Sequence, residues 1–226
     1  MKKIIIITGA NRGLGKAIVD LGLKKENTVV ISLSRSLHEE HKHITTDKLV
    51  FIRTDLSEPF SDVLFQEMNK CISSDSILYF FNNASIILPI AKIGSFNEEN
   101  IETALKVNLQ FPVNLINGLL NNFHENSKVL INITSGAGYN PVPYWSLYGA
   151  SKAYMKMFFS VLREENKHNP RIQLYSIDPG VLDTEMQETI RKNTAPKQYY
   201  FKTLKEENRL IKPTDAAISI FEEINY

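Results

Sequence analysis

The sequence predicts an α/β fold in which helices cover both faces of a doubly wound parallel β-sheet. Six short apolar runs are rich in β-branched or aromatic residues and do not alternate with polar ones, which is typical of strands buried on both faces. Stretches with helical spacing separate these runs, so strand and helix alternate along the chain. The runs cover residues 4–7, 29–33, 49–52, 77–81, 129–133 and 172–177.

The segments between the runs support this order. Ala17, Ile18 and Leu21 give helical spacing before the second run, and residues 63–68 do so before the fourth. The polar residues 36–47 are interpreted as a surface loop between the second and third strands.

The length and composition fit one domain that spans residues 1–226. A chain of 226 residues with 43% hydrophobic and 23% charged residues can bury a single core. The formal net charge of +1 provides no basic field for a nucleic-acid backbone, and no Lys/Arg cluster suits a membrane surface. We therefore expect neither nucleic acid nor a membrane as a partner.

The first residues imitate an export signal but are too short to be one. Lys2 and Lys3 precede the apolar residues 4–7, and the run ends at Thr8. Cys71 is the only cysteine, so an internal disulfide is impossible and no cysteine pair can begin a zinc or redox motif. These features predict a protein of the cytoplasm.

A glycine-rich turn follows the first predicted strand. Gly9, Gly13 and Gly15 have the spacing G-x-x-x-G-x-G, and a helical stretch begins at once. Glycine lets the backbone turn sharply and approach a pyrophosphate, while the N–H groups and positive dipole end of the helix attract the anion. The motif predicts a Rossmann-type dinucleotide site, although a glycine-rich turn without a ligand would show the same pattern.

The end of the second predicted strand indicates which dinucleotide binds. NAD binders usually present a carboxylate there to the ribose hydroxyls, whereas this strand ends Ser34-Arg35-Ser36. Arg35 and Arg12 could hold a ribose 2′-phosphate by charge-assisted hydrogen bonds, which predicts NADP(H). Two solvated surface arginines are the alternative. Asp55, just past the third strand, could cap the adenine side.

These motifs occur in the order found in the short-chain dehydrogenases/reductases, a family that the sequence resembles over nearly its whole length. The matching segments are the glycine turn, Asp55, Asn82-Asn83-Ala84, Asn108, Ser135, Tyr148-x-x-x-Lys152 and Pro179-Gly180. The resemblance implies an oxidoreductase that acts on CH–OH or carbonyl groups. The residues assigned to the cofactor are Gly9, Asn11, Arg12, Gly13, Leu14, Gly15, Arg35, Asp55, Leu56, Asn83, Ala84, Tyr148, Lys152, Pro179, Gly180, Val181 and Thr184.

Tyr148 and Lys152 are suited to proton transfer. They are four residues apart, so on a helix that begins near Ser146 they share one face. An ordinary tyrosine has a pKa near ~10, and a neighbouring ammonium together with the positive nicotinamide should lower it. An amphipathic surface helix with an extended lysine would give the same spacing.

The resemblance implies specific roles for these side chains. Tyr148 donates a proton to the substrate oxygen, Lys152 binds the ribose, and Ser135 hydrogen-bonds the same substrate oxygen. Ser135 precedes Tyr148 by the family's usual separation, with Thr134 as a lower-ranked competitor. Asn108 matches the asparagine that holds a water linking the lysine to solvent.

Several segments resemble the branch that contains sepiapterin reductases and bacterial benzil reductases. They are residues 135–138, 145–148, 179–187 and 204–210. That branch reduces ketones or diketones beside rings, and Tyr139, Tyr144, Trp145 and Met186 could form the substrate walls with Ser135. Packing in the core is an equally good interpretation of these four apolar and aromatic side chains.

The sequence departs from the family pattern at two places. Ser85 follows Asn-Asn-Ala where the family usually has glycine. The chain stops at Tyr226 after an apparent helix, where sepiapterin reductase relatives continue into a last strand and a tail with a substrate-anchoring acid. We therefore prefer reduction of a ketone or diketone over a pterin side-chain carbonyl.

The sequence also allows two rival functions, and the family resemblance implies an oligomer. A non-catalytic NADP(H)-binding regulatory protein could lose the proton-transfer residues, which are intact here. A metal enzyme could use His38, His41 and His43, but no cysteine completes a familiar ligand set, and we expect no metal. By the same family resemblance we expect a homodimer or homotetramer built on helices near residues 108–120 and 146–166.

Overall fold

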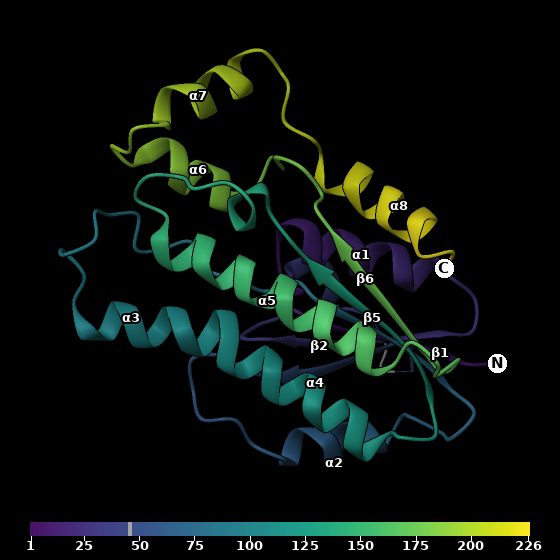
Figure 1. Cartoon of the computed structure of the whole chain (residues 1–226). Coiled ribbons are helices and arrows are strands. Elements are labelled where there is room, and N and C mark those ends of the chain that lie inside the picture. The colour runs from purple at the N-terminus through teal and green to yellow at the C-terminus, as the bar shows by residue number, and fades with distance from the viewer. Residues whose placement is uncertain (45–46) are drawn as a thin grey trace.

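The computed structural model describes residues 1–44 and 47–226, and six parallel strands form its sheet (Figure 1). All six apolar runs are confirmed as strands, with bounds that differ by at most two residues from the predicted ones. The strands are β1 (Lys3–Thr8), β2 (Thr28–Ser34), β3 (Leu49–Arg53), β4 (Ile77–Asn82), β5 (Ser127–Ile133) and β6 (Ile172–Ile177).

The strand order creates a crevice at one end of the sheet. The order is β3-β2-β1-β4-β5-β6, so the chain crosses from one side of β1 to the other between β3 and β4. In sheets of this kind, ligands bind outside the carboxyl ends of the strands at such a switch point. The backbone continues the alignment past the strands, because Gly9 donates to Leu33 O at 2.9 Å and Thr134 donates to Ile177 O at 2.7 Å.

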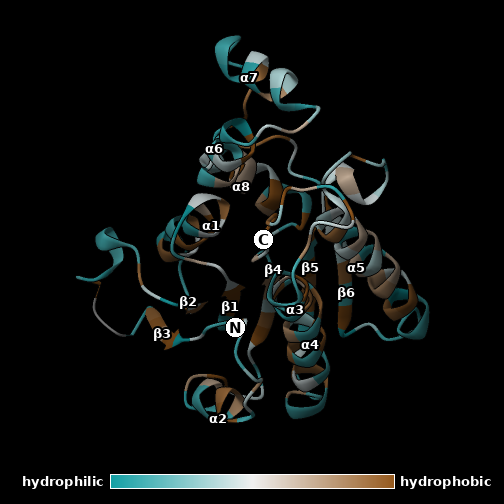
Figure 2. Ribbon diagram, turned by 90° about the vertical axis from the view of Figure 1, so that its left-hand side faces the viewer, coloured by the Kyte–Doolittle hydropathy of each residue, from teal (hydrophilic) through white to brown (hydrophobic). Residues whose placement is uncertain are grey.

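Helices cover both faces of this sheet, as predicted. On one face lie α1 (Gly13–Lys24) and α8 (Pro213–Glu223), and on the other lie α2 (Val63–Asn69), α4 (Phe111–Asn122) and α5 (Ser146–Glu165). Alternate residues of β1 serve the two layers: Ile5 and Ile7 pack toward α1, and Ile4 and Ile6 toward α4. The largely brown strands in Figure 2 therefore belong to two separate apolar cores.

A π-helical turn joins the two helices that precede β5. Asn97 begins α3 (Glu98–Leu105) by accepting a hydrogen bond from the Asn100 N–H at 2.8 Å. The turn Lys106–Gln110 then adopts π geometry before α4 begins. Such bulges are often found at functional sites, and this one carries Asn108.

Two further helices extend beyond the carboxyl ends of the strands (Figure 1). They are α6 (Glu185–Lys192) and α7 (Gln198–Glu206). Their apolar sides form a third cluster with Trp145, whose ring stacks on Phe201 at a centroid distance of 5.3 Å. This cluster closes one side of the crevice.

The polar segment 36–47 is more ordered than a surface loop. Its centre forms a 3-10 turn (Glu39–His41), and His41 is only 3% exposed. The prediction is therefore wrong for His41, because a polar pattern does not reveal a buried partner elsewhere in the chain. Residues 45 and 46 of this segment lie outside the described part.

Within the described residues, no helix is both long and apolar enough to cross a membrane.

Candidate active site

A cleft of about 580 Å³ opens at the carboxyl ends of the strands. Every residue that the sequence assigns to the cofactor lines it, from the glycine turn at one end to Val181 and Thr184 at the other. Ser135, Tyr148 and Lys152 line the same cleft. The predicted site residues therefore converge, except for Asn108, Tyr139 and Tyr144.

The glycine turn is too closely packed to hold side chains in place of its glycines. Gly9 has φ +68° and Gly13 has φ +51°, both in the left-handed region that favours glycine. A Cβ on Gly15 would lie 2.1 Å from Gly9 O, and one on Gly13 would lie 3.1 Å from Thr184 Cγ2. This cradle of bare backbone at the start of α1 fits a dinucleotide pyrophosphate.

Thr8 ties the glycine turn to the segment after β4. Its hydroxyl accepts hydrogen bonds from the N–H groups of Asn83 (3.2 Å) and Ala84 (3.0 Å). The Asn83 amide donates back to Thr8 O at 2.9 Å. The two segments that line the cofactor end of the cleft are thus held as one unit.

The two arginines predicted to bind a 2′-phosphate have different surroundings. Arg12 forms an ion pair with Glu185 at the start of α6. Arg35 lines the cleft and has no ion pair among residues 1–44 and 47–226. Asp55 accepts hydrogen bonds from Ser57, which hold the pKa of its carboxyl below the ordinary value, with a smaller contribution from the charge of Arg35. Arg35 is therefore the better placed of the two for an anion.

Ser135 begins a tight turn against α5. It lies two residues after the end of β5, and its Oγ accepts a hydrogen bond from the Ala137 N–H at 3.3 Å. The turn Gly136–Gly138 lies so close to α5 that a Cβ on Gly138 would be 3.0 Å from the carbonyl carbon of Lys152. These glycines bring Ser135 next to the helix that carries Tyr148.

Tyr148 is buried, and its phenol is harder to ionise than expected. Burial is the main cause that raises its pKa, and the negative charge of Asp178 raises it further. Hydrogen bonding with the side chains of Ser135 and Ser85 lowers the pKa but does not offset burial. The pKa of Tyr148 is thus raised in the protein by itself, whereas the expected lowering included the charge of a bound nicotinamide.

The ammonium of Lys152 is not placed directly against the Tyr148 hydroxyl. Its Nζ lies 5.6 Å from the centre of the Tyr148 ring and donates a 2.8 Å hydrogen bond to Ile133 O. Burial lowers the pKa of Lys152 to about 8, although the charge of Asp178 acts in the opposite direction. The ammonium is thus turned toward the end of β5 rather than fully toward the phenol.

Asn108 is the first exception, because it does not line the cleft. Both atoms of its amide engage the backbone of Ile86: Oδ1 accepts from the N–H and Nδ2 donates to the carbonyl, each at 2.9 Å. Ser85 lies between this clamp and the Ala84 anchor. The side chain of Asn108 therefore positions the segment that carries Ser85.

The substrate end of the cleft differs in part from the prediction. Trp145 and Met186 line it as expected. Tyr139, the second exception, is 54% exposed outside the cleft with the Lys156 ammonium 3.7 Å above its ring, and Tyr144 packs in the apolar cluster without lining the cleft. Tyr139 lies outside because the 3-10 turn at Gly136–Gly138 carries it past the cleft.

Other lining residues were not anticipated. They include Ser85, Val142, Asp178, Ile190, Tyr200 and Phe201. The aromatic sequence at 199–201 was a usable signal for α7, because aromatic side chains often line small-molecule pockets. The residues of α7 and their neighbours in the sequence do not indicate that this helix packs beside the cleft.

The three neighbouring histidines do not form a ligand set. His41 Nε2 bonds to Asp20, and His38 Nδ1 accepts from the Glu40 N–H. In the part of the chain that the structure describes, no group of three or more His, Cys, Asp or Glu side chains is arranged to hold a metal ion.

Comparisons with known proteins agree with this arrangement. The short chain dehydrogenase family model matches residues 3–195. A benzil reductase ((S)-benzoin forming) of Bacillus cereus is 33% identical, covering 96% of this chain and 92% of its own, and the sepiapterin reductase of Rattus norvegicus is 30% identical over 84% and 78%. The crystal structure of the KRED1-Pglu enzyme superposes with a TM-score of 0.84 at 28% identity, covering 96% of this chain and 92% of that one. The chain belongs to the short-chain dehydrogenase family and is an oxidoreductase that acts on carbonyl or CH–OH groups.

Proposed function

We propose that this protein reduces a small-molecule ketone or diketone to an alcohol with NADPH, and that Tyr148 donates the proton. One observation carries the proposal: Ser135, Tyr148 and Lys152 line a single cleft between the glycine cradle and an aromatic wall. A ligand that spans the cleft would have its reactive end beside the two hydroxyl groups. Reduction of a carbonyl group requires a proton for its oxygen, and these hydroxyl groups could supply it.

Bound NADPH would supply the hydride that reduces the carbonyl carbon. Ser135 would donate a hydrogen bond to the carbonyl oxygen, and the phenolic proton of Tyr148 would pass to it. The protonated phenol is the form that can donate, and burial keeps Tyr148 in this form by raising its pKa. One of the three N–H groups of Lys152 is engaged by Ile133, which leaves donors for a ribose hydroxyl and the phenol.

The preference for NADPH rests on Arg35. Its guanidinium is always charged and suits bidentate contact with a phosphate. Arg12 is paired with Glu185 through Nη1, so its charge is shared with that carboxylate.

The shape of the cleft favours a substrate with an aromatic ring beside the carbonyl. Trp145, Phe201 and Tyr200 give one end flat apolar surfaces, and Met186 and Ile190 extend them. The Bacillus cereus relative, a benzil reductase, makes an aromatic diketone the first candidate.

A pterin side-chain carbonyl is the second candidate. The rat relative is a sepiapterin reductase, and the carboxylate of Asp178 lines the cleft, where it could accept hydrogen bonds from ring N–H groups. A non-catalytic NADP(H)-binding regulatory protein would have no use for Ser135, Tyr148 and Lys152 together.

We further propose a homodimer or homotetramer in the cytoplasm. Tyr154, Met157 and Val161 follow one another at helical spacing on α5 and are exposed. An apolar stripe of this kind is suited to a second copy of the chain.

Oxidation of NADPH by the purified protein tests the reaction. Benzil, sepiapterin and simple ketones are compared as substrates, each with NADPH and with NADH. The proposal predicts turnover of an aromatic ketone or diketone and a preference for NADPH. Tight NADPH binding without turnover of any of these would favour the regulatory alternative.

A further inference from the structure

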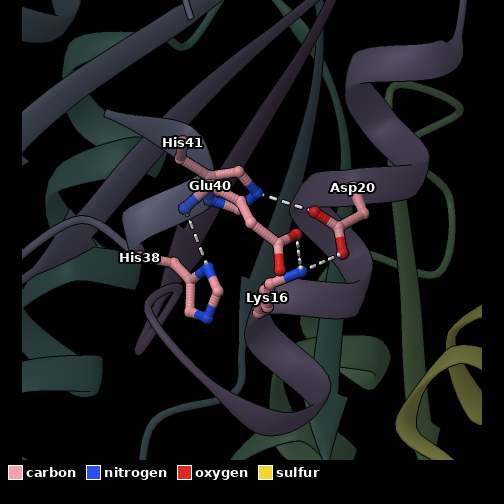
Figure 3. Close-up of polar contacts among 5 residues, drawn as sticks. All are labelled: Lys16, Asp20, His38, Glu40 and His41. Carbon is pink, nitrogen blue, oxygen red and sulfur yellow. Dashed lines mark hydrogen bonds and ion pairs between the residues drawn. The ribbon is translucent and has the colours of Figure 1, made fainter. Parts of the chain in front are cut away.

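A polar network around the buried His41 fixes the segment after β2 to helix α1. Figure 3 shows its members, which come from α1, from the 3-10 turn at residues 39–41 and from His38 directly before that turn. The Nε2–H of His41 donates to Oδ1 of Asp20 at 2.6 Å, since a carboxylate can only accept. His41 is almost fully buried, so this bond is shielded from water.

Lys16 extends the network to a second acid. Its Nζ lies 2.8 Å from Asp20 Oδ2 and 2.8 Å from Glu40 Oε2. Burial by itself would raise the pKa of Asp20, but the hydrogen bonds from Lys16 and His41 outweigh it and hold the pKa below its ordinary value. Asp20 is therefore ionised at neutral pH, and the turn is anchored by a charge.

The turn itself is internally braced. His38 Nδ1 accepts from the Glu40 N–H at 3.3 Å, and the His41 N–H donates to His38 O at 2.9 Å. The two imidazole rings meet edge to face at 5.8 Å. These contacts join His38, Glu40 and His41, so the position of His41 fixes the position of the whole turn.

This anchoring bears directly on Arg35 and Ser36. They lie between the end of β2 and the anchored turn, and Ser36 accepts a hydrogen bond from the Asn11 amide at 3.3 Å. On the β2 side, the Ser34 hydroxyl donates to Ser36 O at 2.9 Å. The short segment is thus constrained at both of its ends.

The charges around the segment favour an anion. The two acids nearest to it in the chain, Glu39 and Glu40, are each paired with a lysine, Lys42 and Lys16. Their carboxylates are thus partly neutralised, while the charge of Arg35 faces the cleft.

From these contacts we infer that Asp20 and His41 are positioning residues that set the preference for a ribose 2′-phosphate by holding Arg35 and Ser36 in place. The inference rests on the proposed use of NADP(H). Neither residue touches the cofactor in this account. Their effect reaches the cofactor through the geometry of the segment, which should matter for NADPH and little for NADH.

Binding of the two cofactors tests this selectivity. Trp145 is the only tryptophan and lines the cleft, so quenching of its fluorescence can report the Kd for NADPH and for NADH without any substrate. His41→Ala should raise the Kd for NADPH about tenfold, the value of one hydrogen bond to a charged group, and change the Kd for NADH less than about twofold. Asp20→Asn should likewise raise the ratio of the Kd for NADPH to the Kd for NADH.

Two further variants separate positioning from folding. His41→Gln keeps an N–H donor near the place of Nε2 and should restore most of the NADPH affinity. His43→Ala removes an exposed histidine from the same segment and should leave both Kd values and the Tm unchanged. If His41→Ala does not fold, the ratio of the Kd for NADPH to the Kd for NADH is compared between His41→Gln and Asp20→Asn. A higher ratio in Asp20→Asn than in His41→Gln then supports the inference, and equal ratios contradict it.

Equal weakening of both cofactors, or no change in either, would overturn the inference while leaving the NADP(H) assignment intact. A wild-type protein that binds NADH as tightly as NADPH would contradict that assignment and the inference with it.

Discussion

The ammonium of Lys152 donates a 2.8 Å hydrogen bond to the main-chain carbonyl of Ile133, the last residue of β5. Ser135 follows only two residues later, so this bond ties the helix that carries Tyr148 to the strand end that carries Ser135. The three side chains are therefore placed relative to one another by the fold itself. Because Lys152 is buried here, its surroundings determine the pH at which it loses its charge.

The first prediction concerns pH. Because burial lowers the pKa of Lys152 to about 8, its charge is present below that pH and is lost above it. We expect kcat/KM for reduction to fall as pH rises through about 8. Asp178→Asn removes a charge that favours the ammonium, so this limb should move to lower pH, by a fraction of a unit that shrinks in high salt because Asp178 is exposed.

A pH–rate profile of the wild type and Asp178→Asn checks this. Asp183→Asn serves as the control, because Asp183 pairs with Lys205 and does not line the cleft. A limb that stays in place in Asp178→Asn, or moves to higher pH, would show that Asp178 does not act on Lys152.

The second prediction concerns the glycine cradle. In Gly15→Ala the new Cβ would lie 2.1 Å from the carbonyl oxygen of Gly9, so the turn must shift and NADPH binding should be lost. Gly94→Ala is the matched control: its φ of +101° costs about 1 kcal/mol of stability, but the space around it is open and binding should persist. Retained NADPH affinity in Gly15→Ala would place the pyrophosphate elsewhere.

The third prediction concerns the packing of Tyr226. Its ring meets Tyr79 at 4.4 Å, and its hydroxyl lies 2.9 Å from the Thr28 hydroxyl. Tyr226→Phe should lower the free energy of unfolding by about 1 kcal/mol, the value of one hydrogen bond. Tyr226→Ala should lower it by about 3 kcal/mol, because the ring contacts are also lost. Chemical denaturation measures both values, and an equal loss in the two variants would mean that the ring contributes nothing.

The fourth prediction concerns assembly. If α5 is an interface, Met157→Asp places a charge in an apolar contact and should weaken self-association at least about tenfold. Light scattering after gel filtration would show a lower mass at a given concentration. The exposed Lys192 on α6 supplies the control Lys192→Asp, which should leave the mass unchanged. An unchanged mass in Met157→Asp would place the interface on another surface.

The sequence predicted the strands and most of the cleft for a physical reason. Buried parallel strands are continuous apolar runs, and a pyrophosphate cradle needs glycine, so both leave a local pattern. The features that the sequence did not predict depend on contacts between segments that are separate in the chain. Arg12 meets Glu185, His41 meets Asp20, and the amide of Asn108 is occupied by Ile86.

The tyrosine pKa illustrates the same limit. Spacing on a helix predicted that Lys152 would face Tyr148, and both do line the cleft. Burial is the main cause that raises the pKa of Tyr148, and the charge of Asp178 adds to it; both come from tertiary structure.

Turnover by Tyr148→Phe tests the central claim most directly. The change removes one hydroxyl and keeps the ring that packs against Trp145. With NADPH binding confirmed by quenching of Trp145 fluorescence, reduction of an aromatic ketone or diketone should fall at least about 100-fold, the usual contribution of a positioned proton donor. Turnover within about twofold of the wild type would contradict the assignment of Tyr148 as the proton donor.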